Sequence, residues 1–306
     1  MAEIYKWRTP DTLDHLILLT DGHTYGDEAG CLEVADAASR DKIGLTLLGL
    51  GAAWNDQLLD EMAARSGGYS SFVDSPDKLV DVFQERFSQL ANVVARNLQL
   101  TLHTDANGQI KDVFRLSPDI SRLSLQNDRL MLGALEVDQS IQVLIEMLVE
   151  PRRPGAARIL QGQLSGELLQ PDSTALSEVD SELTITFDPA LTEAAPAPAD
   201  LMDLVGRVAV FKIQDKAIKE AESGDHRRAQ TRLQNLTTHL LNLGEMELAR
   251  VALLEAAELE RTGHLTTEGR KRIRYGTRNL SAAGRAAAPV GAKPASSTRS
   301  AKLEEE

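Results

Sequence analysis

Apolar runs of strand length alternate with segments of helical periodicity along the first hundred residues. Residues 16–20 and 43–50 are continuous apolar runs, which are typical of strands buried on both faces of a parallel sheet. Between them, apolar residues recur every three or four positions over residues 27–42, which predicts a helix. Asn55 can cap a second helix, and Gly67-Gly68 ends it because glycine readily takes the left-handed conformation.

A short strand over residues 69–73 and a long helix that begins near Pro76 complete a β-α-β-α-β-α order. This order predicts a parallel sheet with helices on both faces. The apolar stripe of the last helix consists of Leu79, Val82, Phe83, Phe87, Leu90 and Val94. Three strands form a small sheet, so we expect uncovered apolar surface and an exposed edge along the first strand.

A different pattern begins near residue 98, where apolar and polar residues alternate with period two. The sequence Asp105-Ala-Asn107-Gly108 then indicates a turn. Further strand-like runs are residues 111–116, 129–135, 140–150, 157–164 and 182–187. Six or seven strands separated by turns predict an antiparallel β-sandwich over residues 98–190.

Helical periodicity returns after a Pro/Ala-rich linker over residues 191–199. Gly224 and Gly244 divide residues 200–263 into three amphipathic helices, which predict a small helical bundle. The two glycine junctions resemble those of tetratricopeptide repeats, but they are 20 residues apart rather than 34, so a regular array is not predicted. The stripe Leu233, Leu236, Leu240 and Leu241 is expected in the core, with a groove for a partner helix as the alternative.

The last segment, residues 264–306, is predicted to be a basic and largely disordered tail. Five of the nine residues from 270 to 278 are Lys or Arg. They fit either a short basic helix that docks on an acidic surface or a membrane, or a solvated helix end. Beyond Ser281 the Ala/Ser/Gly/Pro/Lys composition argues for disorder.

Charge and composition narrow the class of protein. The net charge of the whole chain is −13, but residues 264–306 carry +5, so the rest carries −18. An acidic body disfavours binding to nucleic acid, whose phosphates require a basic surface. The chain has one cysteine, Cys31, no apolar signal segment at its N-terminus and no apolar run near the ~20 residues that span a bilayer. We therefore expect a cytoplasmic protein without membrane spans.

Three motifs in the first segment resemble the second half of a von Willebrand factor type A domain. They are the run from His15 to Asp21-Gly22, the sequence Leu47-Leu-Gly-Leu-Gly51, and the Ser66-Gly-Gly-Tyr69 turn before a short strand. The resemblance covers residues 1–97. The order of the whole chain is similar to bacterial cytosolic proteins in which such a domain precedes a β-module and a helical region.

In that family a divalent cation binds a D-x-S-x-S motif, a Thr from a later loop, and the Asp of a T-D-G segment. Asp21 matches the last of these ligands, but the D-x-S-x-S motif is absent. Because Mg²⁺ requires about six oxygen ligands, we expect this chain alone to bind no cofactor tightly. The resemblance implies Mg²⁺ or Mn²⁺ binding only if the missing half is supplied. Either the chain is truncated, or a separate chain completes the sheet.

The function that these features favour is non-catalytic protein binding or scaffolding. Open α/β sheets bind at the carboxyl ends of their strands, and the family implies protein contacts. The expected contact loops contain Thr20, Asp21, Gly22, His23, Thr24, Tyr25, Trp54 and Asn55. An enzyme is less favoured, because the chain lacks a catalytic triad motif, a P-loop and a complete dinucleotide motif. The alternative is a non-functional fragment of a metal-dependent binding protein.

Overall fold

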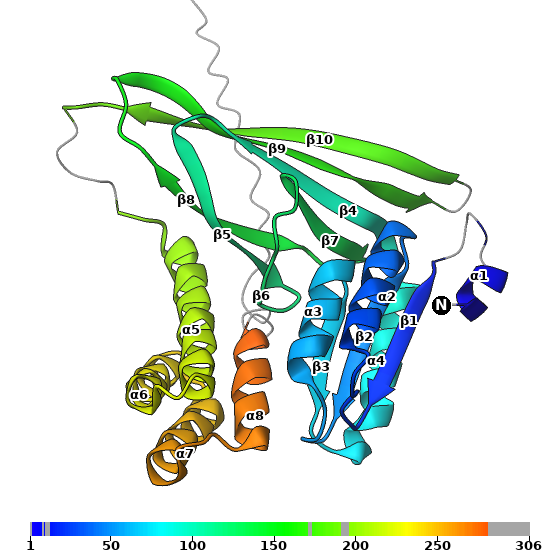
Figure 1. The fold of residues 1–306 in the computed structure, drawn as a ribbon. Helices are drawn as coiled ribbons and strands as arrows, with labels where there is room; N and C mark the ends of the chain where they lie inside the picture. The colour runs from blue at the N-terminus through cyan, green and yellow to red at the C-terminus, as the bar shows by residue number, and fades with distance from the viewer. Residues whose placement is uncertain (1, 8, 10–12, 171–172, 191–195, 281–306) are drawn as a thin grey trace, which may run out of the picture.

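The computed structural model describes residues 2–7, 9, 13–170, 173–190 and 196–280. Its first part, the described residues up to Ala91, is an α/β unit in which β1, β2 and β3 form a parallel sheet in that order (Figure 1). The elements are α1 (Ala2–Trp7), β1 (His15–Thr20), α2 (Glu28–Arg40), β2 (Gly44–Leu50), α3 (Asp56–Ser66), β3 (Tyr69–Val73) and α4 (Leu79–Ala91). The predicted β-α-β-α-β-α order is confirmed.

Strand β2 is the central strand because its sequence is apolar on both faces. Leu45, Leu47 and Leu48 are at most 1% exposed. Helices α2 and α3 pack against one another on one face of the sheet, whereas α4 lies on the other (Figure 1). Asn55 caps α3 as predicted, since its side chain accepts a hydrogen bond from the Leu58 amide at 3.1 Å.

The narrow sheet leaves α4 and β1 poorly covered. The apolar stripe predicted for α4 contains no buried residue, and Phe87 is 63% exposed. The helix also ends at Ala91, so Val94 lies in the following strand and not in the predicted stripe. Among the described residues β1 pairs only with β2, and its Leu18 and Leu19 are each 38% exposed. The expected exposed edge is therefore present.

The second part, the β-module, consists of two antiparallel sheets that pack around one apolar cluster. One sheet has the order β10-β9-β4-β7 and the other β6-β5-β8, which confirms the predicted sandwich. The long β9–β10 hairpin extends well beyond the predicted strand at residues 182–187. The strands are β4 (Val93–Thr104), β5 (Gly108–Ser117), β6 (Ser121–Arg122), β7 (Arg129–Glu136), β8 (Gln142–Val149), β9 (Gly155–Gln170) and β10 (Ser173–Phe187).

The third part is a helical region made of α5 (Ala199–Glu222), α6 (His226–Asn242), α7 (Met246–Thr262) and α8 (Thr267–Arg278). Leu233, Leu236 and Leu240 are fully buried in its core, as expected, whereas Leu241 is 46% exposed. The same core includes residues of β5, so the helical region and the β-module share a cluster. Within the described part of the chain, every helix is too short or too polar to cross a lipid bilayer.

Helix α8 corrects the expectation of a largely disordered tail from residue 264. It is an ordered helix, and its Lys271, Ile273 and Tyr275 are at most 5% exposed. It packs on α5 and α7 and also on the α/β unit, where Arg270 and Tyr275 bond to residues 214 and 215 positions earlier in the sequence. The disorder expected beyond Ser281 and most of the predicted linker at 191–199 lie outside the described residues.

Two glycines allow the α/β unit and the β-module to approach closely. Gly67 ends α3 with a φ of +65°, and Gly133 of β7 has a φ of +86°. A Cβ atom on Gly133 would lie 2.5 Å from the Gly67 carbonyl oxygen, which is too close for any side chain. The junction between the two parts thus depends on the absence of a side chain at residue 133.

We predict that Gly133→Ala destabilises the protein more than Gly26→Ala does. Both glycines have a positive φ, but a Cβ atom at Gly26 would meet nothing within 4 Å. Gly26→Ala should therefore cost only the backbone strain of about 1 kcal/mol, whereas Gly133→Ala should cost roughly 2 kcal/mol or more. Urea unfolding of the two variants measures the difference, and equal losses would show that the junction tolerates a methyl group.

Candidate functional site: the strand-end loops and the docked helix α8

The loop that follows β1 exposes the side chains of Asp21, His23 and Tyr25. Thr20 ends the strand, and its hydroxyl donates a hydrogen bond to the Gly22 carbonyl at 3.1 Å. His23 and Tyr25 lie beside one another, with ring centroids 6.1 Å apart, and Tyr25 is 89% exposed. Asp21 is also exposed. This loop can therefore offer an aromatic pair and a carboxylate to a partner.

The loop does not contain the ligand set of a divalent cation. The described residues include no group of three or more His, Cys, Asp or Glu side chains placed to hold a metal ion. Thr20 is adjacent to Asp21 in sequence, and its hydroxyl oxygen could in principle be a metal ligand. This hydroxyl already donates a hydrogen bond to the Gly22 carbonyl in the same turn. One carboxylate supplies too few oxygens for Mg²⁺ or Mn²⁺, so the residues present do not fit the cation of the resembled family.

The loop that follows β2 is covered by α8. The Lys271 ammonium donates hydrogen bonds to the carbonyl oxygens of Ala52 and Trp54, both at 2.7 Å. It also lies 3.9 Å from the centre of the Trp54 ring, and Tyr275 packs against the same ring. Trp54 is fully buried, so the structure does not place it on the contact surface that the sequence predicted. Asn55 acts as the cap of α3.

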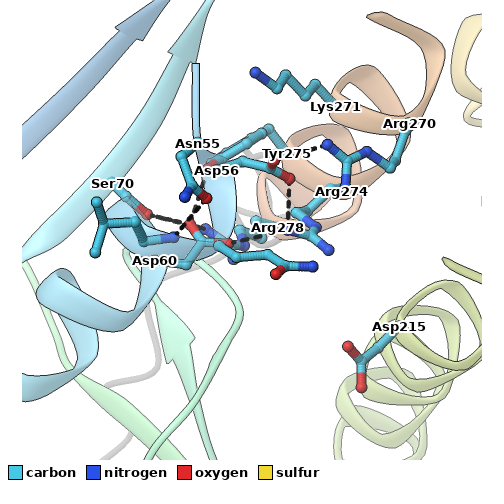
Figure 2. A network of polar contacts seen from close by, with 12 residues as sticks. Asn55, Asp56, Asp60, Ser70, Asp215, Arg270, Lys271, Arg274, Tyr275 and Arg278 are labelled. Carbon is cyan, nitrogen blue, oxygen red and sulfur yellow. Dashed lines mark hydrogen bonds and ion pairs between the residues drawn. The ribbon is translucent and has the colours of Figure 1, made fainter. Parts of the chain in front are cut away.

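A ladder of ion pairs joins α3 to α8 (Figure 2). Asp56 accepts hydrogen bonds from Arg270 at 2.8 Å and from Arg274 at 2.5 Å. One turn further along α3, Asp60 receives both terminal nitrogens of Arg278, at 2.8 and 2.5 Å. Because residues four apart share one face of a helix, two carboxylates of α3 meet three guanidinium groups of α8.

Tyr275 and Ser70 complete the environment of Asp60. The Tyr275 hydroxyl donates to Asp60 at 2.8 Å, and the Ser70 hydroxyl donates to the same oxygen at 2.7 Å. Burial alone would raise the pKa of the Asp60 carboxyl, but Arg278, Arg274 and Ser70 together hold it below its usual value. The Asp60 carboxylate is therefore ionised at neutral pH. Figure 2 shows that Asp215 of α5 lies apart from it.

Lys271 is a buried ammonium whose charge is only partly compensated. Burial lowers its pKa to about 8, although Asp56 acts in the opposite direction. The two carbonyl oxygens and the Trp54 ring provide dipoles rather than a full negative charge. These groups hold α8 against the loop that follows β2.

The sequence contained a signal for this network that went unused. Asp56 and Asp60 are spaced by four residues, and so are Arg270, Arg274 and Arg278. Two such complementary stripes can pair when their helices lie side by side. The docking of a basic helix on an acidic surface was one of the two alternatives for this segment, and the surface belongs to the protein itself.

The comparisons with known proteins agree with this architecture. Residues 199–283 match the family model described as "Sll0103-like, C-terminal alpha-helical domain". The uncharacterized protein sll0103 of Synechocystis sp. is 26% identical over 272 residues, which are 86% of this chain and 64% of that protein. The solved structure of a von Willebrand factor type A protein from Catenulispora acidiphila superposes with a TM-score of 0.70 and 16% identity.

The likeness to the Catenulispora structure shows that the fold is von Willebrand A-like. The superposition covers 88% of this chain and 66% of that chain. The chain thus spans slightly less than two thirds of the length of both relatives. The comparison supports the fold class expected from the sequence, and the helical match supports a distinct C-terminal region.

We predict that Asp56→Asn lowers the free energy of unfolding by about 3 kcal/mol, because the buried Arg270 and Arg274 lose the carboxylate that they share. Arg270 keeps its ion pair with Glu222 and Arg274 keeps Asp60 at 3.7 Å, so the loss lies at the low end for a broken buried ion pair. Glu258→Gln is the matched control, since Glu258 pairs with the exposed Arg261, and it should cost less than about 1 kcal/mol. Urea unfolding of both variants provides the measurement. A loss for Asp56→Asn no greater than that of the control would contradict a structural role for the ladder.

We also predict a specific pH dependence for Lys271→Met. Unfolded lysine has a pKa of about 10.4, whereas burial holds the pKa of Lys271 at about 8. Between these values the unfolded chain binds more protons, so Lys271 makes the free energy of unfolding rise with pH, by up to about 1.4 kcal/mol per pH unit. The variant should lack this rise, and Lys216→Met, at an exposed position, should retain it. Identical slopes in all three proteins would refute the low pKa.

Proposed function

We propose that this protein is a non-catalytic protein-binding or scaffold protein whose contact surface is the β1 edge together with the loop from Thr20 to Tyr25. The observation that carries the proposal is the unpaired edge of β1. Among the described residues, this strand has a hydrogen-bonded neighbour on one side only. An exposed strand edge is a template for pairing with another polypeptide.

The side chains near the edge support the same surface. Leu18 and Leu19 of β1 are each 38% exposed, and Tyr25 stands out at 89% at the carboxyl end of the strand. Exposed aromatic and apolar side chains beside polar groups are characteristic of protein interfaces. A partner strand along β1 would complete the sheet and also contact the loop. Binding of Mg²⁺ or Mn²⁺ would then depend on oxygen ligands that the partner brings to Asp21.

The position of α8 narrows the surface that we propose. The loop from Gly51 to Asn55 is occupied by Lys271 and Tyr275, so it is not part of the partner surface unless α8 moves away. The proposed contact therefore uses Thr20, Asp21, Gly22, His23, Thr24 and Tyr25, and excludes Trp54 and Asn55.

Two features argue against an enzyme. Burial, together with Asp27 and Glu28, raises the pKa of the Cys31 thiol, which disfavours the reactive thiolate. The described residues also contain no cluster of His, Cys, Asp and Glu side chains suited to metal-assisted catalysis.

The proposed location of the protein in the cytoplasm rests on the sequence expectation alone.

To test the proposal, a photo-crosslinking amino acid is placed at Leu18 of the full chain, and the adduct formed in the cells of origin is identified and purified. Binding to that partner is then compared for the parent, Leu18→Lys/Leu19→Lys and Val179→Lys. We expect the double variant to weaken binding by about tenfold or more, because edge lysines oppose strand pairing.

Val179 is the matched control, since it is 59% exposed on β10, in the four-stranded sheet of the β-module. Val179→Lys should bind as the parent does. Equal affinity of the parent and the double variant would overturn the proposal. The alternative of a non-functional fragment predicts instead that residues 15–91 are cleaved rapidly by a protease in the isolated chain, and protection of this segment would exclude it.

A further inference from the structure

A cavity of about 140 Å³ lies at the amino ends of the strands of the parallel sheet, whereas the proposed contact loop follows the carboxyl end of β1. The first residues of all three strands, His15, Gly44 and Tyr69, line it. Strands β4 and β7 close it from the β-module, so the cavity sits at the junction of the two parts. Neither the fold nor the proposed partner surface accounts for it.

The hydrogen-bonding groups left unpaired at this cavity are all donors. Arg86 Nε, Asn97 Nδ2 and Arg115 Nε are buried and have no hydrogen-bond partner in the structure. Buried polar groups are normally satisfied, and leaving one unpaired costs free energy. The complement of three N–H donors is a ligand with acceptor oxygens.

The charges at the cavity favour an anionic ligand. Lys42 and Arg96 both pair with Glu167, and Arg115 pairs with Asp119. Arg86 forms no ion pair with a described residue. It stacks on the Tyr69 ring, 3.8 Å from its centre, and donates a hydrogen bond to Gln89 at 2.6 Å. Glu136 is the acidic residue that lines the cavity, and its side chain or backbone already interacts with another residue.

The remaining wall of the cavity is largely apolar. Leu45, Leu90, Val93 and Met131 contribute side chains to it. A cavity of about 150 Å³ accommodates benzene, so the available space suits an apolar body of about six carbon atoms. An inorganic anion would leave these apolar side chains without contacts.

We propose that this cavity binds a small organic carboxylate, whose oxygens accept hydrogen bonds from Arg86 and Asn97 and whose apolar body contacts Leu90 and Met131. Arg86 is only partly buried, so this end of the cavity is within reach of solvent. The bound carboxylate joins α4 to β4 and strengthens the contact between the α/β unit and the β-module.

His15 offers a reporter for the bound charge. Its Nε2 atom lies 2.8 Å from the Thr46 hydroxyl oxygen, and burial and the nearby Arg86 lower its pKa to about 4. Besides Arg86, the charged groups that line the cavity with it are Lys42, Arg96, Arg115 and Glu136. A carboxylate beside Arg86 offsets the positive charge, so its binding raises the pKa of His15.

The test uses hexanoate as the probe and the full chain, with 1-hexanol and inorganic phosphate as matched ligands. We expect calorimetry to show that hexanoate binds at least tenfold more tightly than either control ligand, and NMR to show that it raises the pKa of His15. Arg86→Met should weaken hexanoate binding by about tenfold or more, since a charged hydrogen bond is lost. Arg158→Gln, at an exposed ion pair with Glu182, should leave binding unchanged.

Asn97→Gly provides a second variant that keeps the fold. Asn97 has a φ of +55°, a conformation that suits glycine, and the substitution removes the side-chain carboxamide with its Nδ2 donor. We expect it to weaken hexanoate binding several-fold without loss of stability. The proposal is overturned if hexanoate does not bind, if 1-hexanol or phosphate binds as tightly, or if both Arg86→Met and Asn97→Gly bind hexanoate as the parent does.

Discussion

The arrangement of the three parts depends on the buried charges between α3 and α8. Asp56 and Asp60 are removed from water, and this cost is offset only because Arg270, Arg274 and Arg278 approach them with direct hydrogen bonds. The pairing fixes the rotation of α8 as well as its position, since only one face of each helix carries the partners. Tyr275 then joins the apolar core of the α/β unit.

The two edges of the three-stranded sheet have different environments as a consequence. Helix α8 contacts β3 and places Tyr275 near Phe72, so this edge is covered by the protein itself. The β1 edge keeps Leu18 and Leu19 exposed. Because the helical region is anchored on one side, a partner that pairs with the sheet is directed to the other side. The surface proposed for binding therefore follows from the same ion pairs that hold the chain together.

The β-module connects the other two parts through two kinds of contact. Phe114 and Ile120 belong to the core of the helical region, so that contact is apolar and closely packed. The contact with the α/β unit is different, because Gly67 and Gly133 meet directly at one point. Beside that point lies the cavity that Arg86 and Asn97 line. The backbones approach closely at the two glycines, and the space beside them is unfilled. This unfilled space leaves room for a ligand at the junction.

The sequence by itself determined the order of strands and helices, the exposed edge of β1 and the absence of the D-x-S-x-S motif. These features depend on local periodicity and on which residues are present, and both can be read from the linear sequence. The burial of Trp54 and the order of α8 were decided by tertiary structure. Helical spacing shows that Arg270, Arg274 and Arg278 share a face, but it does not show what that face contacts. Their partners Asp56 and Asp60 lie more than 200 residues away in sequence, so only the folded chain brings them together.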